Sequence, residues 1–213
     1  MAIQLGDIAP DFEADTTAGL ISFHDWKRGS WAILFSHPND FTPVCTTELG
    51  RVAALKSEFD RRNTKLIGLS VDSVESHERW LVDIADLTGW QVNFPLIGDP
   101  DRRISALYEM IHPNVSDTYT VRSVFVIGPD NRIKLTLNYP ASTGRSFDEI
   151  MRALDALQLS ADYSVATPAD WQRGDEVVIA STVSDEDARR KFPRGFVTKK
   201  PYFRVTPPPN LQD

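Results

Sequence analysis

The order of apolar and polar positions along the chain predicts short strands that alternate with helices. Two continuous apolar runs, 31–35 (WAILF) and 66–71 (LIGLSV), have the length and composition of buried central strands. A third run at 123–127 is followed by the turn GPDNR and by an alternating segment at 133–137, which together predict a hairpin. The N-terminal segment predicts another short hairpin, around a turn at Ala18–Gly19.

Helical periodicity occupies the segments between these strands. Four segments have it, at 42–59, 73–87, 101–108 and 146–157. On the first helix, Cys45 shares its side with three large apolar residues, so we expect the thiol on the inward face. On the second helix, we expect Trp80, Ile84 and Leu87 to point inward.

This order of elements predicts an α/β fold with a central mixed sheet flanked by helices, as in thioredoxin-like proteins. We expect residues 1–160 to form that domain. The remaining residues, 161–213, are rich in turn formers but keep Trp171 and Phe192. Because apolar side chains of this size argue against a disordered tail, we expect a small C-terminal domain that docks on the main domain or on another subunit.

Composition and charge narrow the classes of function. The chain has 213 residues, 41% of them apolar, and a net charge of −7, which argues against a nucleic-acid-binding or anionic-membrane surface. No apolar run is long enough for a membrane span, and the N-terminus lacks the pattern of a secretory signal. One cysteine cannot form an internal disulfide. We therefore expect a soluble, cytoplasmic protein.

The single cysteine lies in the stretch HPNDFTPVCTTE, residues 37–48. Thr42 is a good N-cap residue and Pro43 is favoured at the first helical position, so Cys45 becomes the third residue of a helix. Unpaired amides and the positive end of the helix dipole stabilise a thiolate there. The alternative is a buried, inert cysteine, which is common.

Glu48 makes this arrangement puzzling. A carboxylate one turn from a thiolate repels it, unless an arginine neutralises the carboxylate. An arginine shared between Glu48 and Cys45 would also keep donors free for a substrate oxygen. The sequence leaves open which of the 23 basic residues serves, and the alternative for Glu48 is an exposed helix position.

The motifs resemble those of one known family. Pro38, Thr42 and Cys45 form the P-x-x-x-T-x-x-C pattern of the peroxiredoxins, and SHPNDFTPVCTTEL resembles the one-cysteine, peroxiredoxin-six-like subgroup. The stretch VFVIGPDNRIKLTLNYPASTGRSFDEI resembles a second conserved block of that subgroup, and ATPADW with KFPRGFVTKK resembles its C-terminal domain. The resemblance covers nearly the whole chain.

The resemblance implies a role for each matched residue. Cys45 would be the peroxidatic cysteine, Thr42 would hydrogen-bond the thiolate and the peroxide, and Pro38 would shield the site from water. Four more positions match active-site residues of the subgroup: Arg122 as the arginine beside the thiolate, Glu48 as the group that orients it, His37 as a histidine near the thiol, and Arg145 as a second arginine. Taken alone, Arg122, Arg145 and His37 would be a surface charge, a helix-flanking charge and a loop hydrogen-bonding residue.

The chemistry that this set predicts needs no metal or organic cofactor. A thiolate, a hydroxyl and a guanidinium are enough to displace one oxygen of a peroxide in line. Since the chain has no second cysteine, the sulfenic acid must be reduced from outside, by glutathione, a thioredoxin-type protein or another small reductant. The resemblance also implies at least a homodimer, which the C-terminal region helps to form.

Three other classes of function have less support in the sequence. A serine hydrolase would use Ser30, His24 and Asp130, but the stretch RGSWA lacks both outer glycines of a G-x-S-x-G nucleophile elbow. A chaperone role has no distinct motif here, and a non-catalytic thioredoxin-like module would lack the set of Thr42, Cys45 and Arg122. Metal binding is the weakest, because the four histidines are scattered and no two have i, i+4 spacing.

Overall fold

The computed structural model describes residues 3–210, and a seven-stranded mixed sheet forms the centre of its first part. The strand order is β2-β1-β5-β4-β3-β6-β7. In chain order the strands are β1 (Glu13–Thr16), β2 (Gly19–Ser22), β3 (Trp31–Ser36), β4 (Thr64–Ser70), β5 (Leu96–Gly98), β6 (Arg122–Ile127) and β7 (Ile133–Tyr139). Strands β3, β4 and β5 run parallel, whereas β6 pairs with β3 in the antiparallel sense. The predicted mixed α/β sheet is confirmed.

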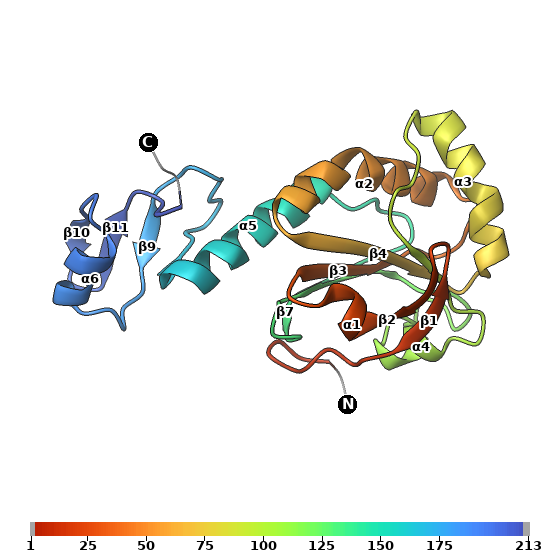
Figure 1. Cartoon of the computed structure of the whole chain (residues 1–213), viewed down its shortest axis with the longest axis horizontal. Helices are drawn as coiled ribbons and strands as arrows, with labels where there is room; N and C mark the ends of the chain where they lie inside the picture. The colour runs from red at the N-terminus through yellow and green to blue at the C-terminus, as the bar shows by residue number, and fades with distance from the viewer. Residues whose placement is uncertain (1–2, 211–213) are drawn as a thin grey trace. The chain divides into compact units, whose positions relative to one another are not determined.

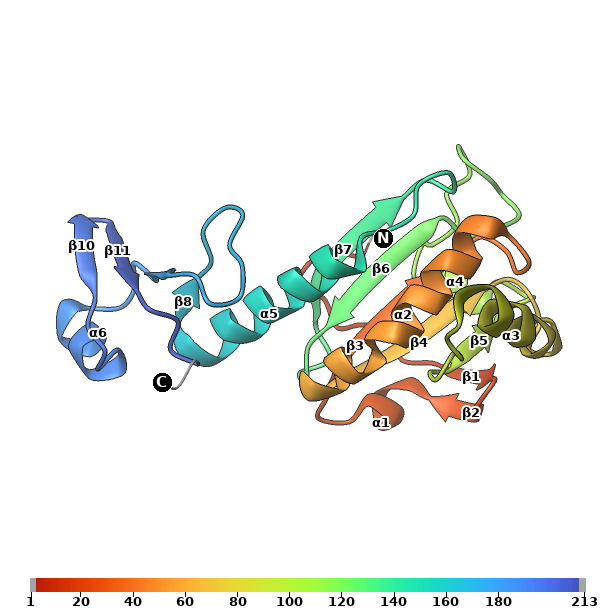
Figure 2. The ribbon, with the colours of Figure 1, turned by 90° about the horizontal axis from the view of Figure 1, so that it is seen from above.

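Helices cover both faces of this sheet. They are α1 (Phe23–Lys27), α2 (Pro43–Arg61), α3 (Val74–Thr88) and α4 (Arg103–Leu107). The longer helices α2 and α3 lie side by side on one face, while α1 and α4 lie on the other (Figures 1 and 2). The short helix α1 lies in the segment where the sequence indicated only a hairpin.

The buried side chains explain this layering. All six residues of β3 and all six of β6 are buried, as expected of strands with helices above and below them. On the inner side of α2, Cys45, Leu49, Val52 and Phe59 are fully buried, as predicted. On the opposite face of the sheet, α1, α4 and the β1–β2 hairpin cover a separate apolar cluster.

One core prediction on α3 is wrong. Trp80 and Ile84 are buried, but Leu87 is 77% exposed. The last turn of α3 does not cover the sheet. Leu87 instead lines an open surface groove together with Phe41 and Trp80. Helical periodicity gave the correct side of the helix but could not tell where the core beneath it ends.

The rest of the chain forms a second compact unit, and the contacts divide the chain between Phe147 and Asp148. This division lies at the start of a long helix, α5 (Phe147–Tyr163), whereas the sequence placed the boundary near the end of that helix. A four-stranded sheet follows, built from β8 (Val165–Ala166), β9 (Val177–Ile179), β10 (Val197–Lys200) and β11 (Phe203–Thr206), with helix α6 (Asp185–Lys191). Trp171 and Phe192 lie in this unit's own core.

Candidate active site

Cys45 lies where the central strand β3 leads into helix α2. Residues 37–42 connect the two elements, and we call this segment the peroxidatic loop, after the role that the resemblance implies for Cys45. Thr42 is the N-cap residue, Pro43 is the first helical residue, and Cys45 is the third. The thiol is fully buried and forms no disulfide. Cys45 therefore lies in the first turn of α2, where backbone amides lack helical partners and the helix dipole is positive.

Thr42 has the predicted N-cap position. Its backbone is extended, as an N-cap requires, yet its side chain makes no cap hydrogen bond. The hydroxyl donates instead to the carbonyl oxygen of Asn39, at 2.9 Å. That bond uses the single hydroxyl proton, so the lone pairs of the oxygen remain available as acceptors. Pro38, in the same loop, is buried.

Arg122 is the arginine that joins Cys45 to Glu48. It is the first residue of β6, which pairs with β3 and so starts beside the end of β3 that leads to the cysteine. Its Nη1 donates to the Sγ of Cys45 at 3.2 Å and to Oε2 of Glu48 at 2.8 Å. Its Nε and Nη2 both donate to the carbonyl oxygen of Ala141. The guanidinium is thus fixed on three sides.

Arg145 holds the other side of Glu48. Its backbone N–H and Nε donate to Oε1 of Glu48, and its Nη2 donates to Oε2 at 2.7 Å. Its Nη1 donates to the carbonyl oxygens of Ser36 and Ser123. The guanidinium carbon lies 5.2 Å from the ring centre of Phe35, which adds a cation–π contact. None of these bonds joins Arg145 to the sulfur. Arg145 instead holds the carboxylate of Glu48 in place.

The charges of this cluster balance only when the thiol is ionised. Glu48, Arg122 and Arg145 are all buried, and together they carry one net positive charge. Burial raises the pKa of Glu48, but the charge and hydrogen bonds of Arg145, and then the charge of Arg122, outweigh burial and hold that pKa below its ordinary value. With Glu48 ionised, a thiolate at Cys45 brings the cluster to neutrality. The repulsion between Glu48 and the thiolate is therefore offset by two cations.

His37 belongs to a second buried cluster that the sequence did not indicate. Its Nε2 lies 3.0 Å from Oδ1 of Asp40, and Asp40 also contacts Nδ1 of His77, from helix α3, at 2.8 Å. All three side chains are buried. The expectation that the histidines are scattered is wrong for this pair, because α3 folds back over the peroxidatic loop. His77 stands three residues before Trp80 on the inward side of its helix, and that spacing could have revealed it.

The residues of the serine-hydrolase alternative do not meet. The hydroxyl of Ser30 donates to Asn63, and Nε2 of His24 bonds the carbonyl oxygen of Ala9. Asp130 accepts from Lys134. In a catalytic triad the serine, the histidine and the acid bond one another in sequence, whereas here each bonds other groups. The structure gives no support to a hydrolytic site at Ser30.

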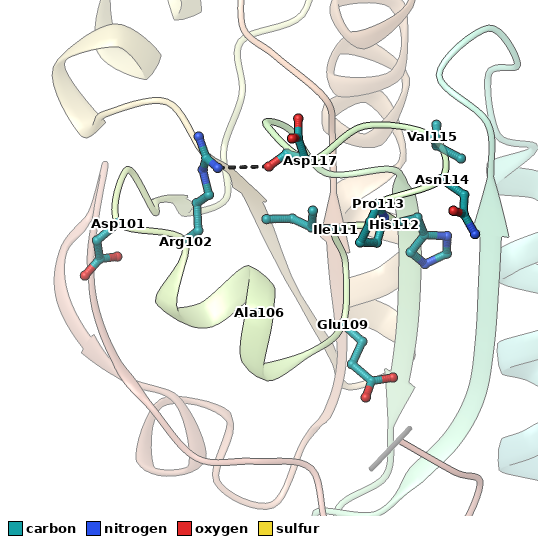
Figure 3. Close-up of a pocket in the computed structure, with 10 residues that line it drawn as sticks. All are labelled: Asp101, Arg102, Ala106, Glu109, Ile111, His112, Pro113, Asn114, Val115 and Asp117. Carbon is teal, nitrogen blue, oxygen red and sulfur yellow. Dashed lines mark hydrogen bonds between the residues drawn. The ribbon is translucent and has the colours of Figure 1, made fainter.

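A surface hollow lies away from the predicted site residues. It has a volume of about 800 Å³ and lies between α4 and the segment 109–117 (Figure 3). Arg102 crosses its upper side and donates to the backbone carbonyl of Asp117. Acidic residues and His112 line it without converging on one point (Figure 3). None of the seven predicted site residues lines this hollow, so it is separate from the cysteine site.

Among the residues that the structure describes, no helix is long and apolar enough to cross a membrane.

Comparisons with known proteins give matches in both parts of the chain. The AhpC/TSA family matches residues 5–136, and the C-terminal domain of 1-Cys peroxiredoxin matches residues 156–195. A 1-Cys peroxiredoxin of Dictyostelium discoideum is 52% identical over 98% of this chain and 86% of its own length. Human peroxiredoxin-6 is 51% identical over 96% of this chain and 97% of its own length.

Solved structures give the same result for the fold. A crystal structure of peroxiredoxin 6 from Arenicola marina superposes with a TM-score of 0.90 at 47% identity, covering 99% of this chain and all of that one. The yeast mitochondrial 1-Cys peroxiredoxin superposes with a TM-score of 0.90 at 48% identity, covering 96% of this chain and 99% of that one. This chain therefore has the thioredoxin-like fold of these proteins and belongs to the peroxiredoxins, the thiol-dependent peroxidases, as a member with one cysteine.

Proposed function

We propose that this protein reduces hydrogen peroxide and organic hydroperoxides through Cys45 as its peroxidatic residue. The observation that carries the proposal is the contact of Arg122 with both Cys45 and Glu48 at the first turn of α2. A buried cation within hydrogen-bond distance of a thiol favours the thiolate, which is the reactive nucleophile. Peroxide reduction needs such a nucleophile together with donors for the oxygen that leaves.

The proposed step is an in-line displacement. The Cys45 thiolate attacks the terminal oxygen of the hydroperoxide, so that an S–O bond forms as the O–O bond breaks. The leaving oxygen takes up a proton and departs as water or an alcohol. Overall, one thiol and one hydroperoxide give one sulfenic acid and one water or alcohol. Sulfur is oxidised by two electrons, and the peroxide is reduced by two.

Each of the other residues has a part in this step. Arg122 stabilises the thiolate and polarises the peroxide, while Glu48 and Arg145 hold the Arg122 guanidinium in place. Thr42 offers its oxygen to the peroxide proton, and Pro38 shields the site from water. His37 acts near the thiol as part of the peroxidatic loop. The contacts of Glu48 with both arginines support this division of roles.

An external thiol closes the proposed cycle. The full sequence contains one cysteine, so no second thiol of this chain can resolve the sulfenic acid. Two reductant thiols therefore return Cys45 to the thiol, with release of one disulfide and one water. The yeast mitochondrial relative has a thiol-resolving mechanism that uses the glutathione and thioredoxin systems. We propose the same two classes of reductant here.

We also propose a homodimer, and the cytoplasm as its compartment. The match of residues 156–195 to the C-terminal domain of 1-Cys peroxiredoxin supports the first. A chain whose single cysteine is a free thiol fits a reducing compartment, which supports the second.

The experiment that tests the proposed function is trapping of the oxidised cysteine. Reduced protein is mixed with one equivalent of hydrogen peroxide and a sulfenic-acid reagent, and the mass of the intact protein is measured. We expect one adduct in the wild type and none in Cys45→Ser. Turnover is then measured with glutathione and with a thioredoxin system as alternative reductants. Absence of the adduct in the wild type would contradict the proposal.

A further inference from the structure

Asp40 and His77 have no part in the step described above, yet both are buried, and together with His37 they form one hydrogen-bonded cluster. Asp40 lies in the middle of the peroxidatic loop, and His77 lies on α3. We propose that Asp40 and a doubly protonated His77 are positioning residues, which hold the peroxidatic loop, and with it Thr42 and Pro38, in the geometry that peroxide attack requires. This inference rests on the proposed role of Cys45.

The hydrogen bonds fix the protonation of His77. Its Nδ1 lies 2.8 and 2.9 Å from the two carboxylate oxygens of Asp40, and its Nε2 lies 3.0 Å from the carbonyl oxygen of Ile97. A carboxylate and a carbonyl only accept, so both ring nitrogens of His77 must donate. A histidine that donates from both nitrogens is an imidazolium cation.

The same bonds fix the state of His37. The ionised Asp40 accepts from its Nε2, so Nε2 carries a proton. Its Nδ1 is buried and has no hydrogen-bond partner among the residues that the structure describes. The pKa values agree with a charged His77 beside a neutral His37. For both rings burial lowers the pKa. The hydrogen bonds and charge of Asp40 outweigh burial in His77, so the pKa of His77 is raised. They do not outweigh burial in His37, so the pKa of His37 stays lowered.

Asp40 is held from two directions. Burial raises its pKa, but hydrogen bonds from His37 and His77 outweigh burial and keep it far below its ordinary value. Its backbone N–H donates to Oδ2 of Asp72, at the end of β4. Asp72 also accepts from the hydroxyl of Ser70. The middle of the peroxidatic loop is therefore tied to both α3 and the central sheet.

The loop needs such support because its next residue is strained. Phe41 has a φ of 52°, in the left-handed region that an aromatic side chain adopts only at a cost. Strain of this kind persists only where neighbouring contacts impose it. Phe41 is also half exposed, so its own packing does not supply the whole support. Asp40, with its hydrogen bonds, directly precedes Phe41. Thr42, the N-cap of the helix that carries Cys45, directly follows it.

A metal site is the alternative use of two histidines and a carboxylate. The ligand atoms of these three residues lie within 4.8 Å of one another. Metal ligands must offer unprotonated lone pairs, however, whereas both nitrogens of His77 are used as donors. Nδ1 of His37 has no hydrogen-bond partner within residues 3–210, and it is the ring nitrogen that does not face Asp40. The hydrogen bonds thus favour a charged hydrogen-bond cluster.

The first test measures two reactions of Cys45 in Asp40→Asn, which keeps the shape of the side chain and removes its charge. Oxidation by hydrogen peroxide needs the aligned loop, whereas alkylation by iodoacetamide needs only the thiolate, which Arg122 supports. We expect oxidation to slow by about tenfold to a hundredfold, as for a misaligned site. Alkylation should stay within about twofold of the wild type. The matched control is Asp11→Asn. Asp11 pairs with His24, and this His–Asp pair lies outside the loop.

The outcomes separate the inference from the proposed function. If the wild type reacts rapidly with peroxide and Asp40→Asn reacts equally fast, the inference is overturned and the proposed function stands. If oxidation and alkylation slow by the same factor, the variant has lost the thiolate and the positioning role is again overturned. If the wild type itself reacts no faster than a free thiol, the proposed function fails first.

A second test avoids the risk that a variant does not fold. The wild type is labelled with ¹⁵N-histidine, and its ring nitrogens are observed by NMR at about pH 8, where a free histidine is neutral. We expect His77 to be protonated on both nitrogens, and His37 to be protonated on Nε2 alone. A neutral His77 would overturn the inference. A shift of the His77 resonances on addition of Zn²⁺ would also overturn it, because it would show that the cluster binds a metal.

Discussion

Two buried carboxylates flank the peroxidatic cysteine, and they are held in different ways. Glu48 lies between two arginines, one of which contacts the sulfur. Asp40 lies between two histidines, and neither is bonded to the sulfur in the described structure. Arginine stays charged at every physiological pH, whereas histidine gains or loses its charge near neutrality. The Glu48 cluster is therefore a fixed electrostatic site, and the Asp40 cluster is a support that responds to pH.

The difference teaches how the site divides its tasks. In the proposed mechanism the Glu48 cluster sets the charge at Cys45, because Arg122 is shared between the carboxylate and the sulfur. The Asp40 cluster sets the shape of the loop that precedes Cys45, because its bonds run to α3 and to the end of β4. Three experiments can break or sharpen this division, and they follow in order of expected effect.

The largest effect is expected from Glu48→Gln. Removal of one charge from a buried ion pair leaves the partner cations uncompensated and costs about 3–5 kcal/mol of the free energy of unfolding. Here both Arg122 and Arg145 would lose their carboxylate. Urea denaturation measures the change.

Glu58→Gln is the matched control, because Glu58 also bonds two arginines, Arg61 and Arg62, but at the surface. Ion pairs at the surface contribute far less to stability than buried ones. Equal losses of the free energy of unfolding in the two variants would show that burial does not make the Glu48 ion pairs more important for stability.

The next effect is expected from Arg122→Gln, measured as the rate of Cys45 oxidation. Removal of a donor that stabilises developing charge in an active site typically costs about 10²–10³ in rate. Here the variant also removes the cation beside the thiolate, so alkylation by iodoacetamide should slow as well. That joint loss distinguishes Arg122 from Asp40, whose variant should slow oxidation alone.

Arg132→Gln is the control for Arg122→Gln. Arg132 is exposed and bonds the carbonyl oxygen of Gly6, away from the cysteine. We expect both rates to match the wild type. If Arg122→Gln also kept both rates, the contact with Cys45 would have no catalytic weight.

The smallest effect is expected in the pH dependence of stability. The pKa of His77 is raised in the folded protein, so above about pH 6.5 the folded state keeps a proton that the unfolded state has lost. The free energy of unfolding should therefore fall as pH rises toward the folded pKa, by at most about 1.4 kcal/mol per pH unit. His77→Gln should remove that slope.

The neighbouring groups do not share this sign. The pKa of His37 is lowered, so its contribution is present above about pH 6.5 and is lost only as pH falls. Asp40 and Glu48 also have lowered pKa values, and both contributions are lost only in acid. Asp72 is the remaining charged group that acts on both rings. A slope above neutrality that survives in His77→Gln would show that the slope does not come from His77.

Much of the first domain could be predicted from the sequence because its signals are local. The apolar runs of β3 and β4, the N-cap at Thr42 and the helical spacing of Cys45 and Leu49 each depend on neighbouring residues. The need for an arginine near Glu48 also followed from local charge repulsion. Its identity as Arg122 came from the resemblance, because 74 residues separate the two partners.

The parts that could not be predicted depend on distant contacts. His77 meets Asp40 only because α3 folds over the peroxidatic loop, 37 residues away in the chain. The exposed position of Leu87 depends on where the core beneath α3 ends. The strands of the C-terminal sheet are two to four residues long, too short to show a clear alternation.

The most direct test of the central claim is the rate at which hydrogen peroxide oxidises Cys45. Stopped-flow mixing can follow tryptophan fluorescence, because the Trp80 ring packs against His37 and Phe41 of the peroxidatic loop. We expect a fast phase whose rate rises linearly with peroxide concentration, which far exceeds the rate of a free thiol and which is absent in Cys45→Ser. A wild type that reacts no faster than a free thiol would contradict the account, because the arginine beside the sulfur would then activate nothing.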